Sequence, residues 1–128
     1  MKSILISSAI CVHMLFSIAE AETYECTVDR KIDGQRVYTQ DELDRYKPIV
    51  RAVRVDSGWI VQRCSYSPTV RQKTCDTYSV DHESTDKFAS ARKLYFFDGQ
   101  FDLQIFRDGR FVENNGRGTI SFGECLVP

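Results

Sequence analysis

Apolar and polar residues alternate along much of the chain beyond residue 22. In the segment 101–105, Phe101, Leu103 and Ile105 occupy every second position, with polar residues between them. Ile120 and Phe122 repeat this period near the end of the chain. A period of two is typical of an antiparallel strand that buries one face and exposes the other. The pattern therefore predicts a sheet with one packed face.

Short turn sequences rich in glycine, aspartate and asparagine separate the apolar runs. Such spacing is typical of antiparallel strands joined by tight turns. At Asn115-Gly116 the sequence predicts a type I′ hairpin turn, followed by a bulge at Gly118. Residues 82–91 are polar with little apolar pattern, and we interpret them as a loop. The predicted strands cover residues 23–29, 49–55, 58–66, 73–80, 93–97, 100–107, 110–112 and 118–125.

One segment departs from the strand pattern. Thr39 and Glu42 have the spacing of a capping box, in which each side chain binds the backbone N–H of the other residue. Leu43 and Tyr46 then follow at helical spacing, and Pro48 ends the run. The segment predicts a helix of about two turns, residues 40–47, that covers one mouth or edge of the sheet.

The N-terminal segment has the pattern of a secretory signal peptide. Lys2 precedes an apolar run over residues 4–18, and Ala19 and Ala21 form a small-x-small cleavage site. The run is short for a bilayer span, which needs about 20 residues, and no second run follows it. We therefore expect residues 1–21 to be a signal peptide and residues 22–128 to be one secreted or periplasmic domain without a membrane span.

The cysteine count depends on this cleavage. Cys11 lies within the predicted signal, so four cysteines remain in the mature chain. An even number of cysteines in an exported domain predicts disulfides, and three pairings are possible. We favour Cys64–Cys75, across a polar hairpin, and Cys26–Cys125, which joins the two ends of the domain. The spacing does not match a metal site, so neither a metal nor a cofactor is expected.

These features together predict an all-β fold. We expect a small antiparallel barrel or sandwich of about seven or eight short strands, with one short helix and two disulfides. A barrel is favoured over a sandwich because closure of the sheet removes exposed strand edges. The whole of residues 22–128 has the length of a single domain.

Charge and residue types limit the function classes. The net charge is −1, so no general positive field attracts nucleic acid. The only histidine after cleavage is His82, and no serine or cysteine nucleophile pattern is present. Asp102 and Glu113 are one pair of carboxylates that a glycosidase-like hydrolase could use if they flanked a cleft. We do not expect an enzyme, and the carboxylate hydrolase is the last of the alternatives.

Two groups of residues are candidate binding residues. Trp59 lies near Arg51, Arg54 and Arg63 on neighbouring predicted strands, and an exposed Trp–Arg patch is typical of a binding hot spot. The alternative is that Trp59 belongs to the core and that these arginines are solvated.

The second group lies in the last predicted turn. Gly116 and Gly118 flank Arg117, next to Asn115, and would display the guanidinium at the tip of the turn. Such a guanidinium could contact an anion or a carboxylate. The alternative is a structural turn without a binding role.

The layout also suggests a kind of protein. A cysteine-bearing strand at Tyr24-Glu25-Cys26 and a last strand with Cys125 resemble the layout of small periplasmic lysozyme inhibitors of the membrane-bound/C-type class. The resemblance covers the layout and two cysteines, and it assigns no inhibitory residue. We expect a monomeric binding module for a protein, an envelope glycan or a small molecule. The alternative is an enzyme inhibitor or immunity-type protein.

Overall fold

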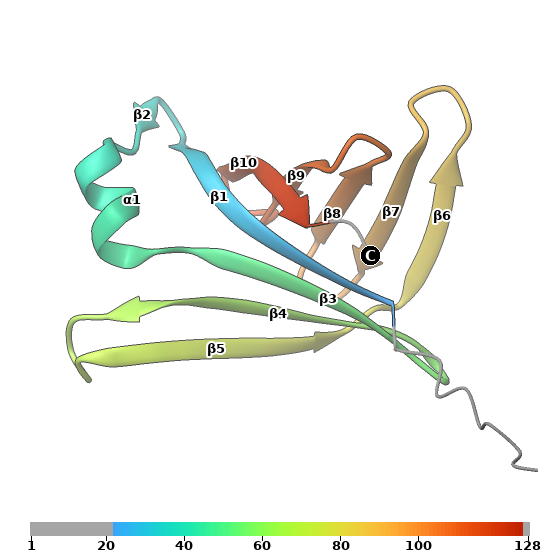
Figure 1. Ribbon diagram of the computed structural model, residues 1–128, viewed down its shortest axis with the longest axis horizontal. Helices are drawn as coiled ribbons and strands as arrows, with labels where there is room; N and C mark the ends of the chain where they lie inside the picture. Colours follow the sequence, from blue (N-terminus) through green and yellow to red (C-terminus); the bar gives the residue numbers. More distant parts are fainter. Residues whose placement is uncertain (1–21, 127–128) are drawn as a thin grey trace, which may run out of the picture.

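One strongly curled antiparallel sheet makes up most of the structure, a computed structural model that describes residues 22–126 (Figure 1). The predicted signal peptide, residues 1–21, lies outside the described residues. A single helix, α1 (Gln40–Tyr46), accompanies the sheet within the described range. The strands are β1 (Thr23–Asp33), β2 (Arg36–Val37), β3 (Ile49–Val55), β4 (Gly58–Ser67), β5 (Gln72–Ser79), β6 (His82–Asp86), β7 (Ala91–Phe96), β8 (Phe101–Phe106), β9 (Arg110–Asn114) and β10 (Thr119–Leu126).

The sheet forms a half-barrel whose two edge strands are consecutive in the chain. Its order is β5-β4-β3-β1-β10-β9-β8-β7-β6, and β2 pairs with β1 outside this path. The link between β5 and β6 connects the two edges: Val80 N–H donates to Trp59 O and Asp81 N–H donates to Tyr95 O, each at 2.9 Å. From this link the edge strands diverge, which leaves the curl open (Figure 1).

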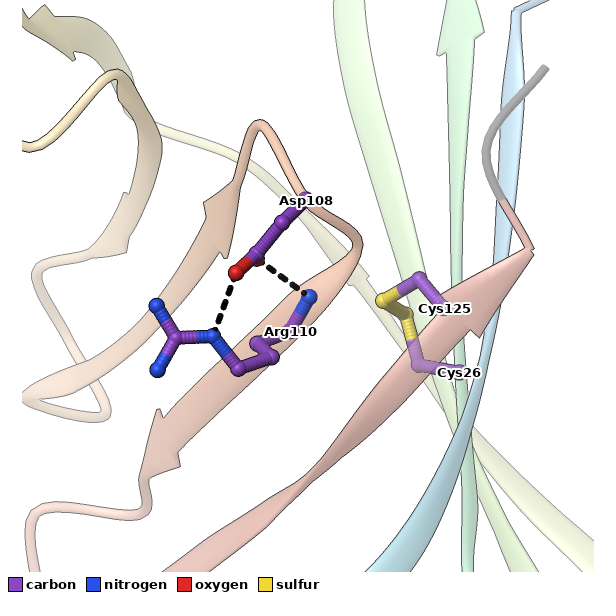
Figure 2. Close-up of a disulfide and its surroundings, with 4 residues drawn as sticks. All are labelled: Cys26, Asp108, Arg110 and Cys125. Carbon is purple, nitrogen blue, oxygen red and sulfur yellow. Dashed lines mark hydrogen bonds and ion pairs between the residues drawn. A yellow bond between two sulfur atoms is a disulfide. The ribbon is translucent and has the colours of Figure 1, made fainter.

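The first and last strands close the middle of the sheet. Cys26 and Cys125 lie directly opposite each other on β1 and β10 and form a disulfide (Figure 2). Cys64 and Cys75 are likewise opposite on β4 and β5 and form the second disulfide. Both predicted pairings are confirmed. The all-β class, the short helix and the two disulfides agree with the sequence prediction.

A β-bulge in β1 changes which side chains face the interior. Val28 lies opposite Gly123 on β10, but Arg30 already lies opposite Phe122, so Asp29 is an extra residue in the ladder. An extra residue shifts the alternation of the strand by one position. Lys31 is therefore opposite Ser121 on the inner face, where an unbroken alternation would have placed it outside.

Apolar side chains fill the concave face of the sheet. The alternation predicted for residues 101–105 is confirmed, because Phe101, Leu103 and Ile105 are all buried. Leu43 of α1 joins the same core, so the helix covers one end of the curl. The core consists of Tyr24, Cys26, Val28, Leu43, Val50, Ala52, Trp59, Val61, Leu94, Phe96, Phe101, Leu103, Ile105, Phe111 and Cys125.

The capping box of α1 forms as predicted. Glu42 N–H donates to Thr39 Oγ1 at 3.2 Å, and Thr39 N–H donates to Glu42 Oε2 at 2.8 Å. The helix ends at Tyr46, one residue earlier than predicted, because Lys47 is its left-handed C-cap with a φ of 44°. Within residues 22–126 there is no helix with the length and apolar content that crossing a membrane requires.

Other details differ from the sequence prediction, including the number of strands, which is ten rather than seven or eight. The sheet is a single layer of ten strands, so the sandwich alternative is wrong. Residues 82–91 contain β6, which was predicted as a loop because this short edge strand is polar on both faces. The turn at Asn115-Gly116 is not type I′, since that turn needs a positive φ at both residues and Asn115 has a negative one.

The close approach of β1 and β10 generates a stability prediction. A Cβ atom at Gly123 would lie within 2 Å of Thr27 O and would also contact the ring of Phe111. We expect Gly123→Ala to lower the free energy of unfolding by at least about 2 kcal/mol, because neither the backbone nor the packed ring has room to move. Urea denaturation of the oxidised protein measures the effect.

The matched control is Gly99→Ala. There the nearest atom to an added Cβ, that of Phe101, lies at 3.8 Å. This variant should stay within about 0.5 kcal/mol of the wild type. Equal stability of the two variants would contradict the role assigned to Gly123.

Candidate functional site

The open side of the half-barrel contains a cleft of about 550 Å³. It lies inside the curl, between edge strand β5 on one side and the β7–β8 and β9–β10 turns on the other. Polar and aromatic side chains share its surface. Its lining residues are Arg63, Thr77, Tyr78, Ser79, Asp81, Phe96, Asp98, Gly99, Phe101, Asn115 and Arg117.

Arg63 on β4 is held in place by a buried carboxylate. Its Nη2 atom donates to Glu113 Oε1 of β9 at 2.7 Å, and the Glu113 side chain is only 3% exposed. The guanidinium also lies over the ring of Phe101, 5.1 Å from the ring centre. About a quarter of the Arg63 side chain, 27%, stays exposed. The ion pair therefore presents a fixed cation to the cleft.

The environment of Glu113 is electrostatically unusual. Burial raises the pKa of Glu113, and the nearby cations Arg63 and Lys31 oppose this shift without cancelling it. Burial also lowers the pKa of Lys31, and the positive charge of Arg63 adds to that effect. The three groups therefore form one coupled cluster on the inner face of the sheet.

An aromatic wall lies beside Arg63. Phe96 and Phe101 pack with their ring centres 4.6 Å apart, and Tyr78 stacks on Phe101 at 5.8 Å. The wall joins β5 to β7 and β8 across the open side, where no backbone ladder connects them. Phe96 and Phe101 are buried, so the partly buried ring of Tyr78 is the part of this wall that a ligand can reach.

The β9–β10 turn forms the rim of the cleft. The side chain of Asn115 accepts from Arg117 N–H at 2.8 Å and from Thr119 N–H at 3.0 Å, so Asn115 shapes the turn. Gly116 has a φ of 71° and packs against the backbone of Gln100 so closely that a Cβ atom would overlap it. Arg117 is exposed, and within the described residues its guanidinium makes no ion pair. The turn thus holds a free cation at the rim.

Two carboxylates line the same cleft. Asp81 Oδ2 accepts from Phe97 N–H at 2.8 Å, so this carboxylate anchors the start of the β7–β8 turn. Asp98 is exposed in that turn. The charged lining of the cleft therefore consists of two arginines and two aspartates, with Arg63 the most enclosed of the four.

Trp59 is a core residue rather than an exposed contact. It is 2% exposed, and its Nε1 atom donates to Glu83 Oε2 at 2.7 Å. The guanidinium groups of Arg54 and Arg92 each lie 4.8 Å from the ring centre. Glu22 bridges these two arginines, at 3.1 Å from Arg54 and 3.0 Å from Arg92.

The predicted Trp–Arg patch is therefore not formed. Residue 51 lies opposite Gln62 and residue 54 opposite Trp59, so Arg51 and Arg54 point to opposite faces of the sheet. Arg51 pairs with Glu25 on the outer face, at 3.4 Å. Arg63 lies on the inner face like Arg54 but belongs to the cleft.

Of the six predicted binding residues, the structure brings three together in the cleft: Arg63, Asn115 and Arg117. The sequence reasoning missed Tyr78, Phe96 and Phe101 as cleft residues. Alternation identified Phe101 as inward-facing, but it does not tell a core ring from one that lines a cleft. The role of Glu113 was also missed, because its partner Arg63 lies on a strand distant in the sequence.

The carboxylate pair of the hydrolase alternative is separated by the sheet. Asp102 lies opposite Asn114, whereas Glu113 lies opposite Leu103, so the two carboxylates face opposite sides. His82 lies on the outer side of β6, with its ring 5.8 Å from that of Tyr95. In the described part of the chain, no three His, Cys, Asp or Glu side chains gather where they could hold a metal ion.

Comparison with known proteins finds no match. The chain matches no protein-family model, no curated protein and no solved structure. The functional proposals below are based on the geometry of the cleft and of its surroundings.

The ion pair at the base of the cleft can be tested by a double-mutant cycle. Arg63→Met leaves Glu113 buried without a partner and should lower the free energy of unfolding by about 3–5 kcal/mol. The double variant Arg63→Met/Glu113→Leu removes both charges and should recover most of that loss, to within about 1–2 kcal/mol of the wild type. Urea denaturation of the oxidised proteins measures both values. A double variant as unstable as Arg63→Met would show that Glu113 is not paired as described.

Proposed function

We propose that this chain is an exported binding module that holds a small ligand in the cleft on the open side of the half-barrel. The observation that carries the proposal is the placement of a rigid cation, Arg63, beside an aromatic wall in a cleft of about 550 Å³. Clefts of about 300–1,000 Å³ with an apolar lining and a few fixed polar groups are typical of small-molecule sites. Two disulfides, typical of exported domains, support the location outside the cytoplasm.

The lining favours a ligand with a flat apolar body and an anionic group. Arg63 is already oriented by Glu113, so binding an anion there costs little side-chain entropy. Arg117 at the rim is free to add a second contact. The partly buried ring of Tyr78, which stacks on Phe101, would contact the flat part of the ligand. A small aromatic carboxylate has this combination of groups.

The test compares phenylacetate with its neutral isostere, phenylacetamide, on residues 22–128. We expect the acid to raise the melting temperature more than the amide at equal concentration, because only the acid carries a negative charge that can form an ion pair with arginine. Arg117→Ala should weaken binding of the acid by about tenfold and leave stability unchanged.

The matched control is Arg71→Ala, which removes an exposed arginine that does not line the cleft. Its affinity for phenylacetate should equal that of the wild type. Equal shifts from acid and amide, or equal losses in the two arginine variants, would contradict an anion-selective cleft.

A second candidate function, inhibition of an enzyme, has its own supporting observation. The β4–β5 hairpin is tied by Cys64–Cys75, and all of residues 72–77 are exposed. Val70 lies exposed in the turn of this hairpin. A rigid projecting hairpin is a feature that could enter the cleft of a partner enzyme with little loss of entropy.

The resemblance in layout to lysozyme inhibitors selects the assay for this candidate. Residues 22–128 should slow cell-wall lysis by a C-type lysozyme, and Val70→Asp should weaken that effect at least about fivefold by placing a charge at the contact. Phe97→Asp, an exposed aromatic outside the hairpin, is the control that should retain inhibition. Absence of inhibition by the wild type would rule out this enzyme as the target.

A further inference from the structure

A second, smaller cavity is also lined by Arg63. Its volume is about 140 Å³. Liquid water occupies about 30 Å³ per molecule, so this space is large enough for a group of about four or five non-hydrogen atoms. Arg63 is the one side chain that it shares with the cleft, as far as the described residues show. Its lining residues are Val28, Lys31, Pro48, Ile49, Val50, Arg63, Cys64, Ser65, Asp76, Glu113 and Ser121.

Lys31 is a partly buried cation without a carboxylate partner. In the described part of the chain, no carboxylate oxygen lies within ion-pair distance of its ammonium group. Its one cation–π contact is with the ring of Tyr38, 5.1 Å from the ring centre. A partly buried charge that lacks a counter-ion is unfavourable, so this position suits an anion.

The ion pair beside Lys31 has an unused donor and an unused acceptor. Arg63 Nε and Glu113 Oε2 are both buried, and neither atom has a hydrogen-bond partner. A native structure leaves few such atoms unpaired, and each costs about 1–3 kcal/mol. A ligand that can both accept and donate a hydrogen bond would satisfy the two atoms together.

Two serine hydroxyls complete the set of polar groups. Ser65 on β4 and Ser121 on β10 line the cavity, and Ser121 is buried opposite Lys31. A hydroxyl donates or accepts as its ligand requires. The cavity therefore offers two cations, two hydroxyls and one buried carboxylate oxygen.

We propose that this cavity is a binding site for a protonated tetrahedral oxyanion of the hydrogen-phosphate class, free or as a monoester. Lys31, Arg63 and the two serines bind the charged oxygens, and Glu113 accepts the hydrogen bond of the ligand's P–OH group. A fully deprotonated anion such as sulfate has no such donor, so the carboxylate of Glu113 repels it. The site therefore binds phosphate in preference to sulfate, because only the phosphate ion carries a proton that it can donate to Glu113.

Other charged groups surround the cavity and affect its pH response. Asp76 lines it from edge strand β5 but is exposed, so solvent screens its repulsion. The negative charge of Asp33 on β1 acts to raise the pKa of Lys31, and that of Asp102 on β8 acts to raise the pKa of Glu113. Since burial raises the pKa of Glu113, a proton shared between Glu113 and phosphate becomes easier to hold as the pH falls. Phosphate binding should therefore strengthen from about pH 8 to about pH 6, where phosphomonoesters also gain a proton.

The experiment is calorimetric titration of residues 22–128 with inorganic phosphate, phenyl phosphate and sulfate at pH 6 and pH 8. We expect phosphate to bind at least about tenfold more tightly than sulfate, and more tightly at pH 6 than at pH 8. Similar affinities for inorganic phosphate and phenyl phosphate would show that the site accepts a monoester, and binding of inorganic phosphate alone would restrict it to the free anion.

Two variants test the assigned roles. Lys31→Met removes a cation that has no ion pair, so the fold should persist while phosphate affinity falls at least about tenfold. Glu113→Gln keeps the shape and supplies an N–H donor, so the preference for phosphate over sulfate should fall at least about fivefold. The control Lys87→Met removes an exposed lysine outside the cavity and should leave phosphate binding unchanged.

Several results would overturn the proposal. They are the absence of phosphate binding to the wild type, equal affinity for phosphate and sulfate, and an equal effect of Lys31→Met and Lys87→Met. If Glu113→Gln fails to fold, the titrations of the wild type and of Lys31→Met still decide the question. Failure of the oxyanion proposal would not decide the cleft proposal, because phenylacetate binding is measured separately and is tested through Arg117, which does not line this cavity.

Discussion

The pairing of β1 with β10 is the constraint on which the rest of the structure depends. It joins the first and last strands of the described chain at the centre of the sheet and allows the two halves to curl toward each other. The Cys26–Cys125 disulfide closes a loop of 99 residues across this pairing, which the chain-entropy model values at about 4.7 kcal/mol. Gly123 is required because β1 approaches β10 too closely for any side chain. Without this strand pairing, the two halves of the sheet would not face each other across its concave side.

The curl encloses charges as well as apolar side chains. At one end, Trp59 is packed among Arg54, Arg92 and Glu83, so its polar N–H and the surrounding charges are paired. At the other end, Arg63 and Glu113 form an ion pair that leaves one donor and one acceptor unused. Buried polar groups are normally satisfied, so the first cluster is structural in character and the second has the features of a site. The two arginine clusters therefore differ more clearly in the pairing of their polar atoms than in their exposure.

The proposed function depends on the incomplete closure of the sheet. A closed barrel would have paired β5 with β6 and left no opening between the two edges. In this half-barrel the backbone connects the two edges through residues 80–81, and a cleft remains between them. The β9–β10 turn then places Arg117 at the rim, because Asn115 binds two backbone N–H groups of the turn. The proposed cleft ligand and the proposed oxyanion site both depend on Arg63, which lies between the two cavities.

The sequence by itself determined the local features: the alternation of residues 101–105, the capped helix, the disulfide pairs, and Arg63, Asn115 and Arg117 as candidates. Each depends on neighbouring residues or on a small number of possible pairings. The sequence prediction was wrong about β10, where Ser121, Gly123 and Cys125 are buried in place of Ile120 and Phe122. Only the tertiary structure decided that the sheet stays open and that the bulge at Asp29 turns Lys31 inward. It also decided that Arg63 meets Glu113 from a distant strand. Register, bulges and curl depend on contacts between distant segments, and no periodicity within one strand specifies them.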